Sequence, residues 1–292
     1  MILSLFSIDV TDASERRWTE NEPPFSPGEL AVFAVRWGPV KGGDISLEVR
    51  PLTELDGEPV WHFAGRAVSS GLVDALYPVD DSIEGLVDTA EFLPRLFEIR
   101  VDEKKERGRR TVIYDHDSGE ARFELDRTFH KDDGPKQEQR VDELGPFAQD
   151  ALSALYRLRM LPVRQVGKTY AVPIHEDGKN WQAEVTVGEV ETLRDTPFGE
   201  IRAYPLELKV RFDGKLKTDR GMTAWIADAP HRALVRFRAG LKFGSLTGEL
   251  RSFRRQTDTA MLGEPVPETI RPEPRLMSES GTGSRVGALS SP

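Results

Sequence analysis

The sequence predicts a mainly β protein: one long, curved antiparallel meander of about eleven strands, forming an open or partly closed barrel, with one short central helix packed on its concave face. From about residue 28 to residue 253, apolar and polar residues alternate again and again, with turn residues between the alternating stretches. A period of two is typical of strands that have one buried and one solvated face. The connections are mostly short, which favours antiparallel neighbours over parallel βαβ units.

Seven strands are predicted before the middle of the chain. Ser26-Pro27-Gly28 is a turn signal that precedes the first strand, and Gly42 and Gly43 are predicted to mark the hairpin turn that follows it. Asp56-Gly57 suits a further tight turn. A single helical turn is expected over 71–76, ending at Tyr77-Pro78. The strands are predicted at 29–37, 45–50, 60–68, 82–88, 95–101, 109–114 and 121–129.

The period then changes to that of a helix. Asp150 is a typical N-cap residue, and leucines recur at every third position from Leu152 to Leu161, before Pro162 stops the pattern. This predicts a helix over 151–161, and because the helix is short we expect it to lie on the sheet. Arg157 and Arg159 flank the leucine stripe and are expected to be solvated, since a buried arginine would need a carboxylate partner. The later strands are predicted at 181–187, 204–212, 221–226, 233–239 and 243–253, with Asp213-Gly214 as a turn.

Composition divides the chain into three parts. Residues 1–24 are poorly patterned and predicted to be poorly ordered, and residues 25–255 form the β domain. Residues 256–292 contain no Phe, Trp or Tyr and are rich in Pro, Gly and Ser. Such a segment buries too little apolar surface to offset the entropy of ordering, so a disordered tail is predicted.

Charge and composition exclude several function classes. The net charge of −9 argues against nucleic-acid binding, which needs a basic surface to displace phosphate counterions. The absence of cysteine excludes disulfides, thiolate catalysis and iron–sulfur clusters. No apolar run approaches the roughly 20 residues of a membrane-spanning helix. Neither a phosphate-binding glycine loop nor a Gly-x-Ser-x-Gly elbow is present, so no cofactor and no enzymatic activity are expected.

Several motifs together resemble the DUF3108 family of uncharacterised bacterial proteins. In chain order they are Phe25-Ser-Pro-Gly-Glu29, Val35-Arg-Trp37 with Gly42-Gly43, Tyr77-Pro-Val-Asp-Asp-Ser-Ile-Glu84, Asp150-Ala-Leu-Ser-Ala-Leu-Tyr-Arg-Leu-Arg159 and Ala224-Trp-Ile-Ala-Asp228. The resemblance spans about residues 25–254. It implies a periplasmic or cell-envelope location and no settled activity. Because Met1–Ile8 lacks a basic leading segment and a cleavage site, no signal peptide is evident and a cytoplasmic location stays open.

The leading functional hypothesis is a non-enzymatic envelope protein that binds a lipid or another amphipathic ligand. A long one-faced sheet with one short helix leaves apolar surface to be covered, and a concave apolar surface is a natural ligand site. Aromatic residues in strands are, however, more often plain core. The predicted ligand-binding residues are Trp37, Tyr77, Leu155, Tyr156 and Trp225.

Two alternatives stay open. The chain could act in assembly, by pairing a sheet edge or its Pro-rich tail with an envelope protein partner. It could instead be a metal-binding hydrolase that uses the carboxylates of Asp80, Asp81 and Glu84. In a strand, however, neighbouring residues point to opposite faces, so the carboxylates of Asp80 and Asp81 would not converge. The structural interpretation is a turn in which an aspartate side chain accepts hydrogen bonds from backbone N–H groups before the strand begins.

Overall fold

The computed structural model describes residues 23–129, 134–212, 215–216, 221–241, 244–255 and 262–263. Residues 1–22 of the predicted N-terminal segment lie outside the described residues, and so does the predicted tail apart from residues 262–263. The predicted turn at Asp213-Gly214 lies outside them as well.

The described residues form seventeen strands in one sheet. The pairings run in the order β8-β7-β6-β5-β4-β3-β2-β1-β16-β15-β14-β12-β10-β9, and every ladder is antiparallel. The bounds are β1 Leu30–Trp37, β2 Val40–Leu55, β3 Glu58–Ser69, β4 Asp80–Asp88, β5 Pro94–Asp102, β6 Glu106–Asp115, β7 Glu120–Phe129, β8 Lys136–Glu143, β9 Thr169–Glu176, β10 Lys179–Val187, β11 Glu191–Thr196, β12 Gly199–Phe212, β13 Lys215–Leu216, β14 Met222–Ala227, β15 Leu234–Gly240, β16 Ser245–Arg254 and β17 Leu262–Gly263.

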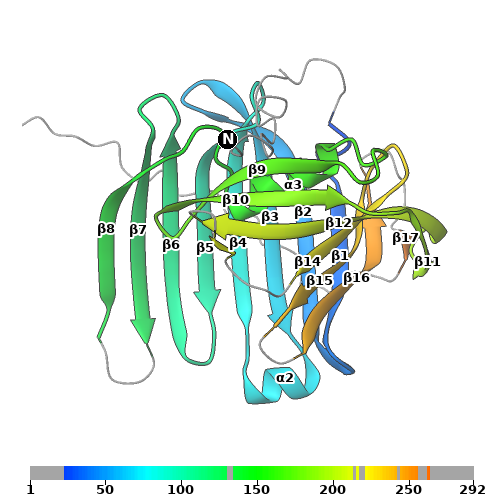
Figure 1. The fold of residues 1–292 in the computed structure, drawn as a ribbon. Coiled ribbons are helices and arrows are strands. Elements are labelled where there is room, and N and C mark those ends of the chain that lie inside the picture. The colour runs from blue at the N-terminus through cyan, green and yellow to red at the C-terminus, as the bar shows by residue number, and fades with distance from the viewer. Residues whose placement is uncertain are drawn as a thin grey trace, which may run out of the picture.

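The sheet curls so that its last strands lie in front of its middle strands. In Figure 1, β9, β10 and β12 cross in front of the long strands β2–β5, and the helix α3 (Ala151–Met160) lies between these two layers. The second helix, α2 (Gly71–Leu76), joins β3 to β4 at the lower end of the sheet and is the helical turn predicted there. The predicted fold class, a curved antiparallel sheet around a central helix, is confirmed.

The helix α3 divides the apolar interior into two clusters. Leu152, Tyr156 and Met160 pack with Phe63, Phe97 and other side chains of the middle strands. Leu158 packs instead with the residues of β9, β10, β12 and β14, such as Val185. Eight of the ten helix residues are buried. A helix too short to be stable alone is therefore held by burial on both sides.

The predicted hairpin turn at Gly42 and Gly43 is wrong. The turn between β1 and β2 lies at Gly38 and Pro39, and both later glycines are part of β2. Gly43 pairs with Ser69, and a Cβ atom on Gly43 would lie 2.1 Å from the carbonyl oxygen of Val68. A glycine here permits close approach of two backbones, which produces the same sequence signal as a turn.

The expectation that Arg157 and Arg159 are solvated is also wrong, because both side chains are buried. Arg159 has the carboxylate partner that such burial requires: it forms an ion pair with Glu29. The sheet further contains β8, β9 and β11, which the alternation did not predict.

Candidate functional site

Two of the predicted ligand-binding residues lie next to each other on α3 but belong to different clusters. Tyr156 is 2% exposed and stacks on Phe63, with 3.9 Å between ring centroids. Leu155 is partly buried against the cluster formed by the front strands. Tyr156 is therefore a core residue, and a ligand would reach its ring only if the cluster opened.

The other three predicted residues have separate surroundings. Trp37, at the end of β1, is 51% exposed. The indole Nε1 of Trp225 donates a hydrogen bond to Glu191 over 2.9 Å. Tyr77, next to α2, donates its hydroxyl to Glu103 over 2.5 Å, and this bond raises the pKa of Tyr77 to about 12. A binding role for the five residues together stays a prediction.

The three predicted carboxylates lie on one strand, β4, and the strand separates them. Asp80 and Glu84 share one face, and Asp81 points to the other. Asp80 accepts two hydrogen bonds from Arg66, both 2.7 Å long. Glu84 accepts from Arg50 over 3.2 Å and lies 3.2 Å from Nε2 of His62. Among the described residues no group of three or more acidic or histidine side chains is arranged to hold a metal ion.

The pKa values of these carboxyl groups move in opposite directions. Burial raises the pKa of Asp81 to about 6, although the Asp102 amide donates to its side chain over 3.0 Å. Burial also acts to raise the pKa of Glu84, but the hydrogen bond to His62 and the charge of Arg50 outweigh it and lower the pKa. Glu84 is thus a structural anion that holds Arg50.

A different set of side chains forms the part of the inner face next to α3. Cross-strand pairing aligns one residue from each strand between β2 and β8 in a line that we call the inner row: Leu47, Gly65, Ile83, Ile99, Arg110, Leu125 and Glu138. Its four apolar side chains pack against the cluster that contains Leu152 but are only partly buried. The neighbouring line holds Gly85, where a Cβ atom would lie 3.5 Å from Leu152. The helix therefore covers one line of side chains and leaves the inner row half-covered.

Figure 1 gives the reason for this partial burial. β9, β10 and β12 cross in front of β2–β5, and the lower ends of β4–β8 extend below the level of this crossing. The partial burial of the apolar residues of the inner row fits incomplete cover by this layer. The sequence pattern could not reveal it, because alternation identifies the apolar face of each strand but not how far another layer covers that face.

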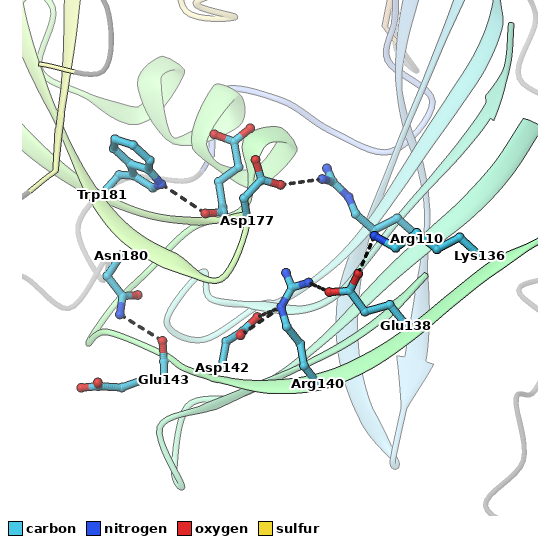
Figure 2. Close-up of polar contacts among 10 residues, drawn as sticks. Arg110, Lys136, Glu138, Arg140, Asp142, Glu143, Asp177, Asn180 and Trp181 are labelled. Atoms are coloured by element: carbon cyan, nitrogen blue, oxygen red, sulfur yellow. Dashed lines mark hydrogen bonds and ion pairs between the residues drawn. The ribbon is translucent and has the colours of Figure 1, made fainter. Parts of the chain in front are cut away.

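Charged residues lie within and beside the inner row on the side of β8. Figure 2 shows Arg110 reaching Asp177 in the turn between β9 and β10, at 3.1 Å. Arg140 of β8 binds Glu138 over 2.5 Å and Asp142 over 2.9 Å, and it lies 3.5 Å above the ring of Phe123. The side chain amide of Asn180 donates to the carbonyl of Glu143 over 3.0 Å. These contacts join the two ends of the sheet and place a charged border beside apolar side chains.

The family can now be stated. The model of the family described as "Protein of unknown function (DUF3108)" matches residues 32–251. This chain belongs to the DUF3108 family. No curated protein matches this DUF3108 chain.

Solved structures are similar to this DUF3108 chain to different degrees. One is a β-barrel-like protein of the domain of unknown function DUF1849 from Brucella abortus, with a TM-score of 0.53 and 13% identity, covering 78% of this chain and 97% of that one. Another is a putative lipoprotein from Parabacteroides distasonis, with a TM-score of 0.35 and 11% identity, covering 79% of this chain and 98% of that one. At these identities the first likeness extends to the fold alone. Among the described residues, neither helix is long and apolar enough to cross a membrane.

Proposed function

We propose that this DUF3108 protein is a non-enzymatic cell-envelope protein that binds an amphipathic ligand along the inner row. The observation that carries the proposal is the partial burial of Leu47, Ile83, Ile99 and Leu125 on the inner face, next to α3. Half-covered apolar side chains on the inner face favour binding of an acyl chain or another apolar group. Each Å² of apolar surface that the ligand buries stabilises the complex by about 25 cal/mol.

The charged border suits the second half of such a ligand. Arg110 pairs with Ile99 and Leu125 across the sheet, and Arg140 pairs with Phe123 one pair further along β7 and β8, so an apolar group lying on Ile83 and Ile99 would bring its polar end to these guanidinium groups. Both arginines are held by carboxylates, which an anionic head group would partly replace. The envelope location is the one expected from the family resemblance.

The alternatives have less support. As a docking edge for a partner, β8 pairs with β7 alone among the described residues, but its sequence of mixed charges from Lys136 to Glu143 is typical of an edge protected against strand addition. For a metal-dependent hydrolase, each of Asp80, Asp81 and Glu84 has a protein partner, and the three do not converge.

Native mass spectrometry of the full chain, purified gently from a bacterial envelope fraction, tests the proposal. We expect an adduct that denaturation releases as a lipid. Ile99→Gln and Leu125→Gln on the inner row should each reduce its occupancy several-fold, because an amide would lie against the apolar ligand. Glu124→Gln, on the exposed opposite face of β7, is the matched control and should retain the adduct. A clean apo mass that added lipid does not change would reject the proposal, and so would equal occupancy in all three variants.

A further inference from the structure

The opposite face of the same strands carries a second feature, a polar hollow of about 450 Å³. It lies over β2–β7, on the outer face of the sheet, and its size is that of a small-molecule site. Its charged lining consists of Arg50, Arg66, Asp80, Glu84, Arg100, Asp102, Arg107, Arg109 and Asp126. Five arginines and four acidic residues thus converge on one concavity.

The arginines are concentrated along one line across the hollow. Cross-strand pairing aligns Arg66, Ser82, Arg100, Arg109 and Asp126, one residue from each of β3 to β7. We call this line the arginine row. Neighbouring strands are about 4.8 Å apart, so Arg100 and Arg109 stand directly beside each other, and Ser82 lies beside Arg100.

The arginines that line the hollow differ in their ion pairs with acidic residues. Arg66 is bound by Asp80 in a bidentate pair, and Asp102 lies 2.8 Å from Arg107. Arg100 binds Glu98 of its own strand through Nε over 2.6 Å. For Arg109 no ion pair is found within the part of the chain that the structure describes. The paired arginines are therefore oriented by their carboxylates, while Arg109 lies between Arg100 on β5 and Asp126 on β7.

Two like charges directly opposite each other across a ladder destabilise the sheet. Arg100 and Arg109 are such a pair, and they lie inside a hollow large enough for a ligand. An oxyanion between the two guanidinium groups would remove the repulsion and accept hydrogen bonds from both, with the Ser82 hydroxyl close by.

We propose that the hollow on the outer face binds a phosphate-type oxyanion, held by Arg100 and Arg109 with Arg66 and Ser82 beside them. The ligand is a phosphate, either the free ion or the phosphate group of a small organic phosphate or of a lipid head group. This site is independent of the inner row, because neighbouring residues such as Ile99 and Arg100 point to opposite faces of the sheet.

Isothermal titration of the full chain with inorganic phosphate and with glycerol 3-phosphate, at low ionic strength, tests this proposal. We expect saturable binding, weakened at least tenfold by Arg109→Gln and by Arg100→Gln. Arg238→Gln is the matched control, because Arg238 is an exposed arginine of β15 that does not line the hollow. This variant should bind as the unsubstituted chain does.

Thermal unfolding provides a readout that mere loss of structure would not imitate. Arg109→Gln should raise the midpoint in the absence of phosphate, because the repulsion from Arg100 disappears, and should abolish the rise that phosphate produces in the unsubstituted chain. Phosphatidylglycerol vesicles distinguish the sources: binding to vesicles but not to either soluble phosphate, lost in Arg109→Gln, supports a lipid head group. Absence of binding to all three probes, or equal binding by Arg109→Gln and Arg238→Gln, would overturn the proposal whatever happens at the inner row.

Discussion

Arg159 of α3 and Glu29, the residue before β1, form a buried bidentate ion pair. The two bonds measure 2.5 Å and 3.0 Å, and the side chains are 5% and 3% exposed. Arg159 also donates to the carbonyl oxygens of His231 and Arg232, in the loop between β14 and β15. One guanidinium group therefore joins the central helix, the first strand and a distant loop, with most of its donors satisfied.

Removal of one partner from this pair should be costly. Glu29→Gln leaves the Arg159 charge buried without its carboxylate, and we expect a loss of about 3–5 kcal/mol in the free energy of unfolding. Urea denaturation at pH 7 measures it. Glu200→Gln, which breaks an exposed pair with Arg194, is the control and should cost less than about 1 kcal/mol. Equal losses in the two variants would show that the buried pair has no special role.

The Asp150 side chain caps α3, and we expect its hydrogen bonds, rather than its negative charge, to provide most of the stabilisation. Asp150 accepts hydrogen bonds from the amides of Leu152 and Ser153 over 2.7 Å and 2.8 Å, and the Ser153 hydroxyl accepts from the Asp150 amide over 3.0 Å. Asp150→Ala leaves buried amides unpaired and should cost about 2 kcal/mol. Asp150→Asn retains an acceptor and should cost less than half of that. Chemical denaturation of both variants checks the order, and a reversed order would contradict the capping role.

The elevated pKa of Asp81, about 6, predicts a specific pH dependence. This value lies above the ordinary 3.8. Between about pH 4 and pH 6 the Asp81 carboxyl group is therefore protonated in the folded chain but ionised in the unfolded chain. The contribution of Asp81 to stability therefore falls as the pH rises through this window and is constant above it. Asp81→Asn should be more stable than the unsubstituted chain at pH 7.5, by about 1 kcal/mol after allowance for solvent screening of a half-exposed group.

The measurement for Asp81 is the difference in unfolding free energy between the two proteins at pH 4 and at pH 7.5. The difference should shrink towards zero at the lower pH. A loss of stability in Asp81→Asn of the same size at pH 4 and at pH 7.5 would contradict this prediction, because such an effect would not depend on the charge of Asp81.

Close backbone approach makes one glycine irreplaceable. A Cβ atom at Gly43 would lie 2.1 Å from the Val68 carbonyl oxygen, so Gly43→Ala must move β2 away from β3. We expect a loss of about 3 kcal/mol or more, or failure to fold. Gly221→Ala is the matched control, because nothing lies within 4 Å of its Cβ position, and it should be neutral or slightly stabilising. Thermal melts of both variants compare them, and similar midpoints would refute the packing argument.

Local signals in the sequence were enough to predict many of the elements. The alternation of Ile45, Leu47 and Val49 needs no partner strand to be recognised, since it reflects the two faces of any half-buried strand. The N-cap at Asp150 and the stop at Pro162 act within a few residues, so the bounds of α3 were predicted within one residue. The family motifs have the same local character, and they identified the family without indicating an activity.

The sequence patterns did not predict elements whose stability comes from pairing with neighbouring strands. Strand β8, from Lys136 to Glu143, has a largely exposed side-chain pattern and almost no apolar residue, and it exists because its backbone pairs with β7. Gly43 was interpreted as a turn because a close contact between strands and a tight turn select the same residue.

The sequence by itself determined the strand and helix types, the capping of α3 and the membership of the family, because these depend on residues close together in the chain. The tertiary structure alone decided that Arg159 meets Glu29 and which residues line the inner row and the arginine row. Those relationships depend on register and on how far one layer covers another. Such distances arise between residues that lie far apart in sequence, where no local pattern records them.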